Sequence, residues 1–296
     1  MIRQTFPKSH TKIDGGAKKS FAHLECEWHD CKELYAGVEG WDDSRGSDSW
    51  IGGSKSDLAE YLDKGSYKKL EASVKTSEKI LAAIDMGSYV QQTVAGPCGF
   101  SPIVPAYIQG HPMSMYSRER AVDNSITGAI RIFCDTASIA SVSTEDMRRR
   151  GEAVAAMVLA LQSIRPVEVY ACVIAGDDYI KDVTSLVSVR LGTRPINQAR
   201  IMAALAEPSF ARRFLYTVCQ KIGQKHKWDS DVEIGTLSGM PPSSIPRYIG
   251  MGPTDIHIGY LARDEVNEIR NDAVGWVKKH LEASLKGEGN AWKIDK

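Results

Sequence analysis

The sequence lacks the segments that mark membrane-spanning and exported proteins. Its longest apolar run, near residues 153–161, is far shorter than the roughly 18 residues that a membrane span needs, and it lies inside an amphipathic pattern. The first residues, Met-Ile-Arg-Gln, begin no apolar stretch of the kind that a secretory signal requires. We therefore expect no membrane partner and a cytoplasmic location, in the host cytoplasm if the protein is viral.

Cysteine is sparse, and its spacing fits no framework. Six cysteines are scattered over 296 residues, so a set of structural disulfides is not expected. Cys134, Cys172 and Cys219 fall in apolar patterns, which predicts buried free thiols in a reducing compartment. Zinc-type ligands gather near the N-terminus, at His23, Cys26, His29 and Cys31. Their spacing matches no zinc finger, so we predict no metal site there.

No complete catalytic or nucleotide-binding motif occurs. Neither GxxxxGK[ST] nor GxGxxG is present, which disfavours a classical nucleotide pocket. Cys98 and His111 are the one conspicuous nucleophile and base, but no third group orients them and no oxyanion motif accompanies them. The prediction is a protein that is not an enzyme and holds no cofactor.

Charge is balanced overall and uneven locally. The composition, 43% hydrophobic and 25% charged, is that of a globular protein, and the net charge is zero. Residues 1–20 carry five bases and one acid, a net charge of +4, whereas residues 25–63 carry eleven acids and three bases, a net charge of −8. Residues 190–228 carry eight bases and one acid, a net charge of +7. The acidic segment is expected either to mask the basic one or to form a partner surface.

The N-terminal third is predicted to be helical. Residues 1–16 are polar and end in two glycines, which indicates a mobile basic arm. A helix is predicted over residues 18–35, another is opened by Ser54, and a third covers residues 66–86. The apolar positions behind the first helix are Leu24, Trp28, Cys31 and Tyr35. A helical N-terminal segment over residues 17–92 follows.

The remainder, residues 93–296, is predicted to be an α/β core with a C-terminal helix, forming one compact unit with the N-terminal segment. Residues 94–115 hold four prolines and three glycines, so they cannot form one regular element. Strands are predicted at 129–134, 167–175, 183–191 and 256–261, and helices from 143 to Pro166 and at 196–206, 208–222 and 264–285. The fold class is α/β: a mixed sheet with a central βαβ unit packed by helices.

The turn after the first core strand is where ligands usually bind in a βαβ unit. This turn, residues 135–141, begins with Asp135 and resembles the metal-binding loop of von Willebrand A domains. That loop has the pattern Asp-x-Ser-x-Ser, whereas this chain has Ala137 and Ile139 at the serine positions. A structural turn is favoured. The alternative function is a von Willebrand A-like protein-interaction module with a degenerate metal site at Asp135 and Ser138.

The basic residues offer the strongest functional signal. Bases alternate with aromatic residues from 210 to 228, and phosphate contacts combined with ring stacking hold single-stranded nucleic acid. Three arginines near a helix start are suited to phosphate as well. The predicted DNA-binding residues are Arg148, Arg149, Arg150, Arg190, Arg194, Arg200, Arg212, Arg213, Tyr216, Lys221, Lys225, Lys227 and Trp228.

Short motifs resemble a largely uncharacterised family of tailed-bacteriophage proteins. They are Val94-Ala95-Gly96-Pro97, Tyr107-Ile108-Gln109-Gly110-His111-Pro112-Met113, Arg149-Arg150-Gly151-Glu152-Ala153 and Pro208-Ser209-Phe210-Ala211-Arg212-Arg213-Phe214. The resemblance covers residues 35–220. It implies an early viral protein that binds single-stranded DNA and recruits a phage RNA polymerase to melted promoters, with no catalytic residues. We expect a homo-oligomer whose partners are single-stranded DNA and that polymerase.

Overall fold

The computed structural model describes residues 3–5, 11–12, 18–37, 47–83, 89–122, 129–139, 141–162, 166–176, 183–192, 196–225 and 255–285. The chain divides into two compact units. The main unit comprises Met1–Ala83 and Ala129–Lys296, and the hairpin unit comprises Ile84–Gly128. The predicted boundary between residues 92 and 93 therefore does not separate the two units.

The α/β fold class is confirmed. The strands are β1 (Arg3–Thr5), β2 (Thr11–Lys12), β3 (Lys18–Glu27), β4 (Tyr89–Gly96), β5 (Ser101–Pro102), β6 (Met115–Val122), β7 (Ile130–Asp135), β8 (Val167–Gly176), β9 (Val183–Arg190) and β10 (Ile256–Ile258). The helices are α1 (Cys31–Ala36), α2 (Asp48–Ile51), α3 (Lys55–Lys64), α4 (Leu70–Ala83), α5 (Val104–Ile108), α6 (Thr144–Gln162), α7 (Gln198–Ala206), α8 (Tyr216–Lys225), α10 (Arg263–Asn271) and α11 (Ala273–Leu285), with a short 3-10 turn η1 (Trp28–Asp30) and a π-helical segment η3 (Phe210–Leu215).

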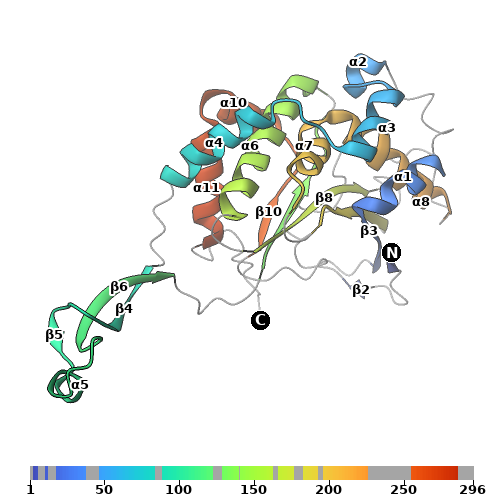
Figure 1. Cartoon of the computed structure of the whole chain (residues 1–296). Helices are drawn as coiled ribbons and strands as arrows, with labels where there is room; N and C mark the ends of the chain where they lie inside the picture. The colour runs from blue at the N-terminus through green and yellow to red at the C-terminus, as the bar shows by residue number, and fades with distance from the viewer. Residues whose placement is uncertain are drawn as a thin grey trace. The chain divides into compact units, whose positions relative to one another are not determined.

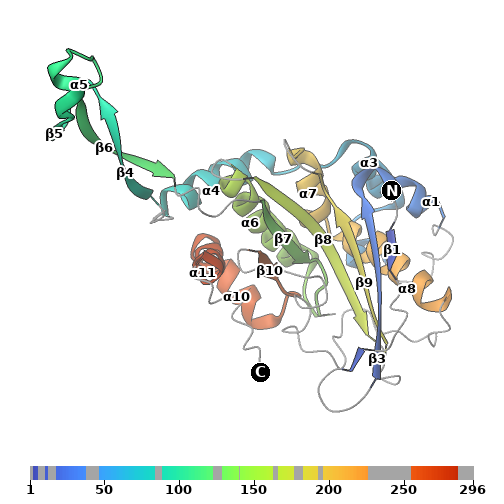
Figure 2. The same ribbon diagram turned by 90° about the horizontal axis from the view of Figure 1, so that it is seen from below.

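The described strands of the main unit form a seven-stranded mixed sheet in the order β1-β3-β9-β8-β7-β10, with β2 also paired to β3. Strands β7 and β8 are parallel, with Ile132 opposite Val169, and α6 connects them. This is the predicted central βαβ unit. Strand β10 pairs in parallel with the other edge of β7, whereas β9 is antiparallel to β8. Helices α3, α4, α6 and α7 lie along one face of the sheet (Figures 1 and 2).

The N-terminal part needs two corrections. Residues 18–27 form strand β3 instead of the predicted helix, and β3 pairs in parallel with β9 over eight residues. Helical structure begins only at Trp28 and continues in α1 to α4, so the helical N-terminal segment is confirmed in its later part. Residues 3–5 and 11–12 of the predicted mobile arm are strands paired with β3, and the rest of that arm lies outside the described residues.

Close packing of α6 against α7 fixes the helical layer. Buried alanines on α6 narrow the distance between the two helices. A methyl group added at Gly151 would overlap the carbonyl oxygen of Leu205 and the Cα of Ala206. The backbone of α7 therefore lies directly against α6, and position 151 requires glycine.

We expect Gly151→Ala to destabilise the fold by about 1–3 kcal/mol or more, because the added methyl must push the two helix backbones apart. The matched control is Gly259→Ala, since a methyl group at residue 259 would meet no atom within 4 Å. Urea unfolding followed by circular dichroism measures both variants. Equal midpoints for the two would show that α6 and α7 do not pack as described.

Candidate functional site

The order of the strands identifies where a ligand site is expected. The crossover from β7 through α6 leads to β8, while β10 joins β7 on the opposite side. In open α/β sheets, ligands bind at the carboxyl ends of the strands at such a reversal of order. Here this place lies between the turn that follows β7 and residues 259–262, which follow β10. It includes the turn at Asp135 that the sequence singles out.

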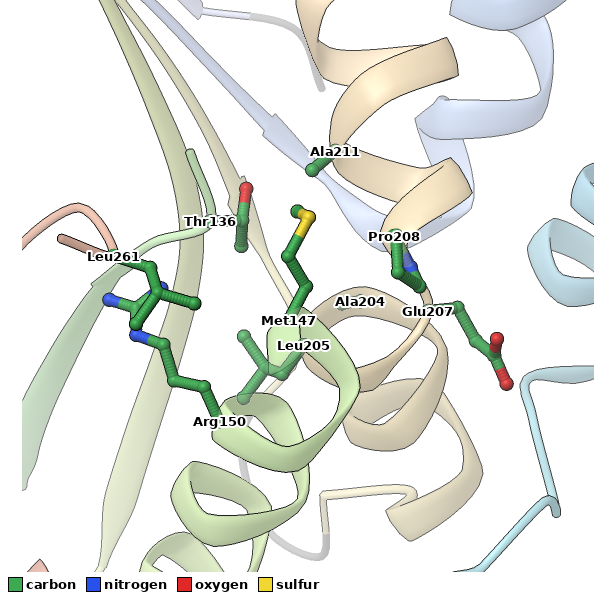
Figure 3. A pocket seen from close by; sticks show the side chains of 9 residues that line it. All are labelled: Thr136, Met147, Arg150, Ala204, Leu205, Glu207, Pro208, Ala211 and Leu261. Carbon is green, nitrogen blue, oxygen red and sulfur yellow. The ribbon is translucent and has the colours of Figure 1, made fainter. Parts of the chain in front are cut away.

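Arg150 of α6 occupies this place. Its side chain is buried; Nη1 donates to the carbonyl oxygen of Asp135 at 2.7 Å, and Nη2 donates to the carbonyl oxygen of Gly259. The backbone adds a hydrogen bond from Leu261 N to Ala137 O at 2.9 Å. Figure 3 shows Arg150 reaching toward Leu261. The guanidinium thus joins the carboxyl ends of β7 and β10.

Arg212 of η3 fills the other side of the same turn. It is 2% exposed, and its Nη2 donates to Val142 O at 2.9 Å and to Ser138 Oγ at 3.3 Å. Nη1 donates to Trp50 O, and the guanidinium carbon lies 4.3 Å from the centre of the Trp50 ring. A cation over an aromatic face is a favourable arrangement when it is desolvated. Burial lowers the pKa of Arg212.

The same guanidinium weakens the interpretation of the Asp135 turn as a metal site. The Ser138 hydroxyl, a candidate ligand, already faces the fixed positive charge of Arg212 at 3.3 Å. The Asp135 carboxyl accepts a hydrogen bond from Ala137 N at 2.9 Å, and burial raises its pKa to about 6. Among the described residues, no cluster of three or more His, Cys, Asp or Glu side chains has a geometry that would hold a metal ion.

Two more arginines hold the acidic N-terminal segment in place. Arg213 is buried and donates to Asp48 Oδ1 at 2.6 Å and to Gly53 O at 3.3 Å. Arg148 donates to Gly52 O at 2.8 Å. Of the two roles that the sequence left open for residues 25–63, masking of the basic segment is the one these contacts support.

The remaining predicted DNA-binding residues divide into three groups. Arg190 bridges Glu27 at 3.2 Å and Glu168 at 2.7 Å, and Lys221 donates to Gly37 O. Arg149, paired with Glu145 at 3.6 Å, and Arg200 are at least partly accessible to solvent. The positions outside the description are Arg194, Lys227, Trp228 and the side chain of Lys225.

Burial therefore corrects the predicted site at Arg150, Arg212, Arg213 and Tyr216. Tyr216 is 4% exposed, and its hydroxyl oxygen accepts from Ser138 N at 3.4 Å. Phe210 and Phe214 are the aromatic residues interleaved with these bases. Their ring centroids lie 5.2 Å apart in the core. Their alternation with bases reflects a buried helix and not a stacking surface for nucleotides.

The space left at this site is too small for a ligand. A cavity of about 10 Å³, lined among others by Thr136, Met147 and Arg150, lies beside the β7 turn (Figure 3). A cavity of that size holds about one water molecule. The carboxyl end of β7 is thus closed by the protein's own side chains.

The surface that the sequence-based reasoning missed lies in the hairpin unit. This unit is a three-stranded antiparallel sheet in the order β4-β6-β5, with α5 between β5 and β6. Among the described residues, eight large hydrophobic side chains are exposed, and six of them belong to this unit. They are Phe100, Val104, Tyr107, Ile108, Met113 and Tyr116. Ile108 is 78% exposed and Tyr107 63%.

A signal for this surface was present in the sequence. Residues 86–117 contain no Asp, Glu, Lys or Arg, in a chain of which 25% is charged. Between residues 93 and 117 only Gly96 is buried, so this part of the unit has no side-chain core of its own. A large exposed apolar surface of this kind marks an interaction site. Cys98 and His111, the candidate nucleophile and base, are both exposed within it.

Comparison with known proteins identifies a family without a described activity. A family model described as a domain of unknown function (DUF7192) matches residues 17–284, and the chain therefore belongs to that family. Searches of curated proteins and of solved structures give no significant match. Within the described ranges, no helix combines the length and the apolar character that crossing a bilayer requires.

We expect Arg212→Ala to lower the free energy of unfolding by about 3 kcal/mol, because it removes several hydrogen bonds made by a charged group and leaves buried carbonyls unpaired. Arg149→Ala is the matched control on the exposed surface and should change stability by less than about 0.5 kcal/mol. Urea unfolding curves measure both. Similar stabilities would contradict the burial of Arg212.

The stability of Asp135→Asn relative to the parent protein should depend on pH. Because the folded pKa of Asp135, about 6, lies above the ordinary value of 3.8, the carboxyl destabilises the fold as it ionises between these values. The advantage of the asparagine should therefore grow between pH 4 and 6, by at most about 1.4 kcal/mol per pH unit.

Unfolding curves at several pH values measure this difference. Burial lowers the pKa of His23 and His257 to about 4, so their contributions to stability are lost as the pH falls through the same range. Both histidines are present in parent and variant, and their effect cancels in the comparison. A difference that stays constant from pH 4 to 7 would show that Asp135 is not desolvated.

Proposed function

We propose that this chain is a non-enzymatic protein-interaction module that docks through the hairpin unit. The single observation that carries the proposal is the exposed, charge-free apolar surface of Phe100, Tyr107, Ile108 and their neighbours. The cores of protein interfaces are depleted of charge and enriched in aromatic residues and methionine. This surface has that composition, and the side chains of the hairpin unit do not bury it.

The small cavity at the carboxyl end of β7 supports the same proposal. Catalysis or small-molecule binding needs a concave site, commonly of about 300–1,000 Å³. Among the residues that the structure describes, the cavity beside Arg150 at the carboxyl end of β7, where such a site is expected, measures about 10 Å³. The proposal retains the protein-interaction alternative from the sequence but moves the contact surface from the Asp135 turn to the hairpin unit.

A second cavity does not alter this choice. A surface groove of about 380 Å³ lies between α4, α6, α10 and α11. Its two bases are already paired: Arg149 lies 3.6 Å from Glu145, and Arg270 holds Asp146 with two hydrogen bonds of 2.8 and 2.7 Å. A groove whose cations face the protein's own carboxylates offers a ligand little net charge to recognise.

Single-stranded DNA binding, with recruitment of a phage RNA polymerase, stays a prediction. Residues 86–117 have no Lys or Arg to contact phosphate, and phosphate contacts dominate affinity for nucleic acid. Among the predicted DNA-binding residues that the structure describes, Arg149 and Arg200 are the informative ones to substitute, because their side chains reach solvent. Arg212 and Arg213 are unsuitable, since substitution would perturb the fold.

Site-specific photocrosslinking tests the docking proposal in cells that produce the full chain. A benzophenone side chain at position 107 should form an adduct with a protein, whereas the same group at position 67 should not. Tyr107 and Tyr67 are matched, being 63% and 69% exposed, and they lie in different units.

Three results would contradict the proposal: no adduct at position 107, equal adducts at both positions, or an adduct with lipid or DNA in place of protein. The mass of the adduct also identifies the partner class, because a second copy of this chain doubles the mass.

A further inference from the structure

Strand β4 lies at the edge of the described sheet of the hairpin unit. All eight residues of β4, Tyr89–Gly96, pair with β6 in one unbroken antiparallel register, from Tyr89 opposite Val122 to Gly96 opposite Met115. In the part of the chain that the structure describes, no strand pairs with the other edge of β4. Such an edge presents a row of backbone N–H and C=O groups that can pair with another strand.

Strand β4 has none of the sequence features that usually prevent edge pairing. Natural edge strands are kept short or carry charge, proline or a bulge. The other described edges follow this rule: β5 has two residues and contains Pro102, and β1 and β10 have three residues each. The sequence of β4, Tyr-Val-Gln-Gln-Thr-Val-Ala-Gly, has eight residues with no charge and no proline.

We infer that β4 pairs antiparallel with β4 of a second copy of this chain, joining the two hairpin units into one continuous sheet. This inference rests on the proposed function and identifies its partner. A twofold contact brings the same residues together from both sides. A partner strand that carried charge would repel itself there, but β4 carries none. The charged residues nearest to it in the sheet, Arg118, Glu119 and Arg120, belong to β6, on the side of β4 away from the free edge.

Symmetry restricts the register. A twofold axis perpendicular to the sheet keeps each side chain on its own face, and directly opposed residues of paired strands must share a face. The axis must therefore lie midway between the two copies of one residue, so that this residue is opposite itself. It cannot lie at a point where two different residues are opposite each other. The residues nearest the middle of β4 are Gln92 and Thr93. With the axis at Gln92, the backbones of the two copies of residue 92 lie opposite each other, and residue 90 opposes residue 94 of the second copy.

Light scattering combined with size-exclusion chromatography of the full chain tests the inference. We expect a dimer for the parent and a monomer for the double variant Gln92→Lys with Thr93→Lys, which places like charges beside the axis in either register. Gln198→Lys is the control for an added charge, because Gln198 is exposed on the main unit, and it should leave the dimer intact.

Cysteine crosslinking tests the register without relying on a disrupted strand. In a Cys98→Ser background, Gln92→Cys or Thr93→Cys should form a covalent dimer under a mild oxidant, whereas Lys75→Cys on α4 should not. If the double lysine variant stays dimeric and neither cysteine crosslinks, the chain dimerises elsewhere and the inference is overturned.

The inference and the proposed function can fail separately. A parent protein that is monomeric at tens of micromolar overturns pairing through β4. If position 107 still crosslinks to a different protein in cells, docking through the hairpin unit stands with that other partner. If it crosslinks to nothing, both are refuted.

Discussion

The burial of guanidinium groups at the carboxyl end of β7 is the constraint around which the main unit is organised. Arg150 and Arg212 are 4% and 2% exposed, and burying a charge is costly unless hydrogen bonds compensate for the lost water. Here the acceptors are mainly backbone carbonyls: those of Asp135 and Gly259 for Arg150, and those of Trp50 and Val142 for Arg212. For each arginine, the two carbonyls belong to segments far apart in the sequence.

This arrangement explains why the central turn is closed. The planar guanidinium presents several donors in a fixed fork, so one side chain can join two or three segments at once. In many α/β proteins the same position is left open for a ligand. In this chain the guanidinium groups of Arg150 and Arg212 already occupy that position with positive charge, where a bound cation or substrate would otherwise lie. Of the eight large hydrophobic side chains that are exposed among the described residues, six lie in the hairpin unit.

Sequence-based prediction succeeded where the deciding signal was local in the chain and failed where it depended on distant residues. The βαβ unit was predictable because β7, α6 and β8 each carry their own periodicity and the helix start has its cap, Ser143 accepting from Asp146 N at 3.2 Å. Strand β3 was predicted as a helix because Leu24 and Trp28 are four residues apart, which satisfies both a helical and a strand period. What decides in favour of a strand is pairing with β9, about 160 residues away in the chain, and no local pattern records that.

Charge counting failed for a related reason. A net charge of +7 over residues 190–228 states how many cations there are but not where their acceptors lie. Arg213 meets Asp48, and Arg190 meets Glu27, both in the acidic segment more than 160 positions earlier. The complementary −8 of residues 25–63 was visible, yet its pairing with the basic segment depends on the folded chain.

The absence of charge was more informative than its presence. A basic residue can be buried, paired or exposed, so a cluster of bases is compatible with several structures. A stretch such as residues 86–117, which has aromatic and aliphatic side chains and no charge, either forms a core or needs cover from elsewhere. The structure excludes the first possibility for residues 93–117, where Gly96 alone is buried. The second then follows: these side chains need cover from elsewhere.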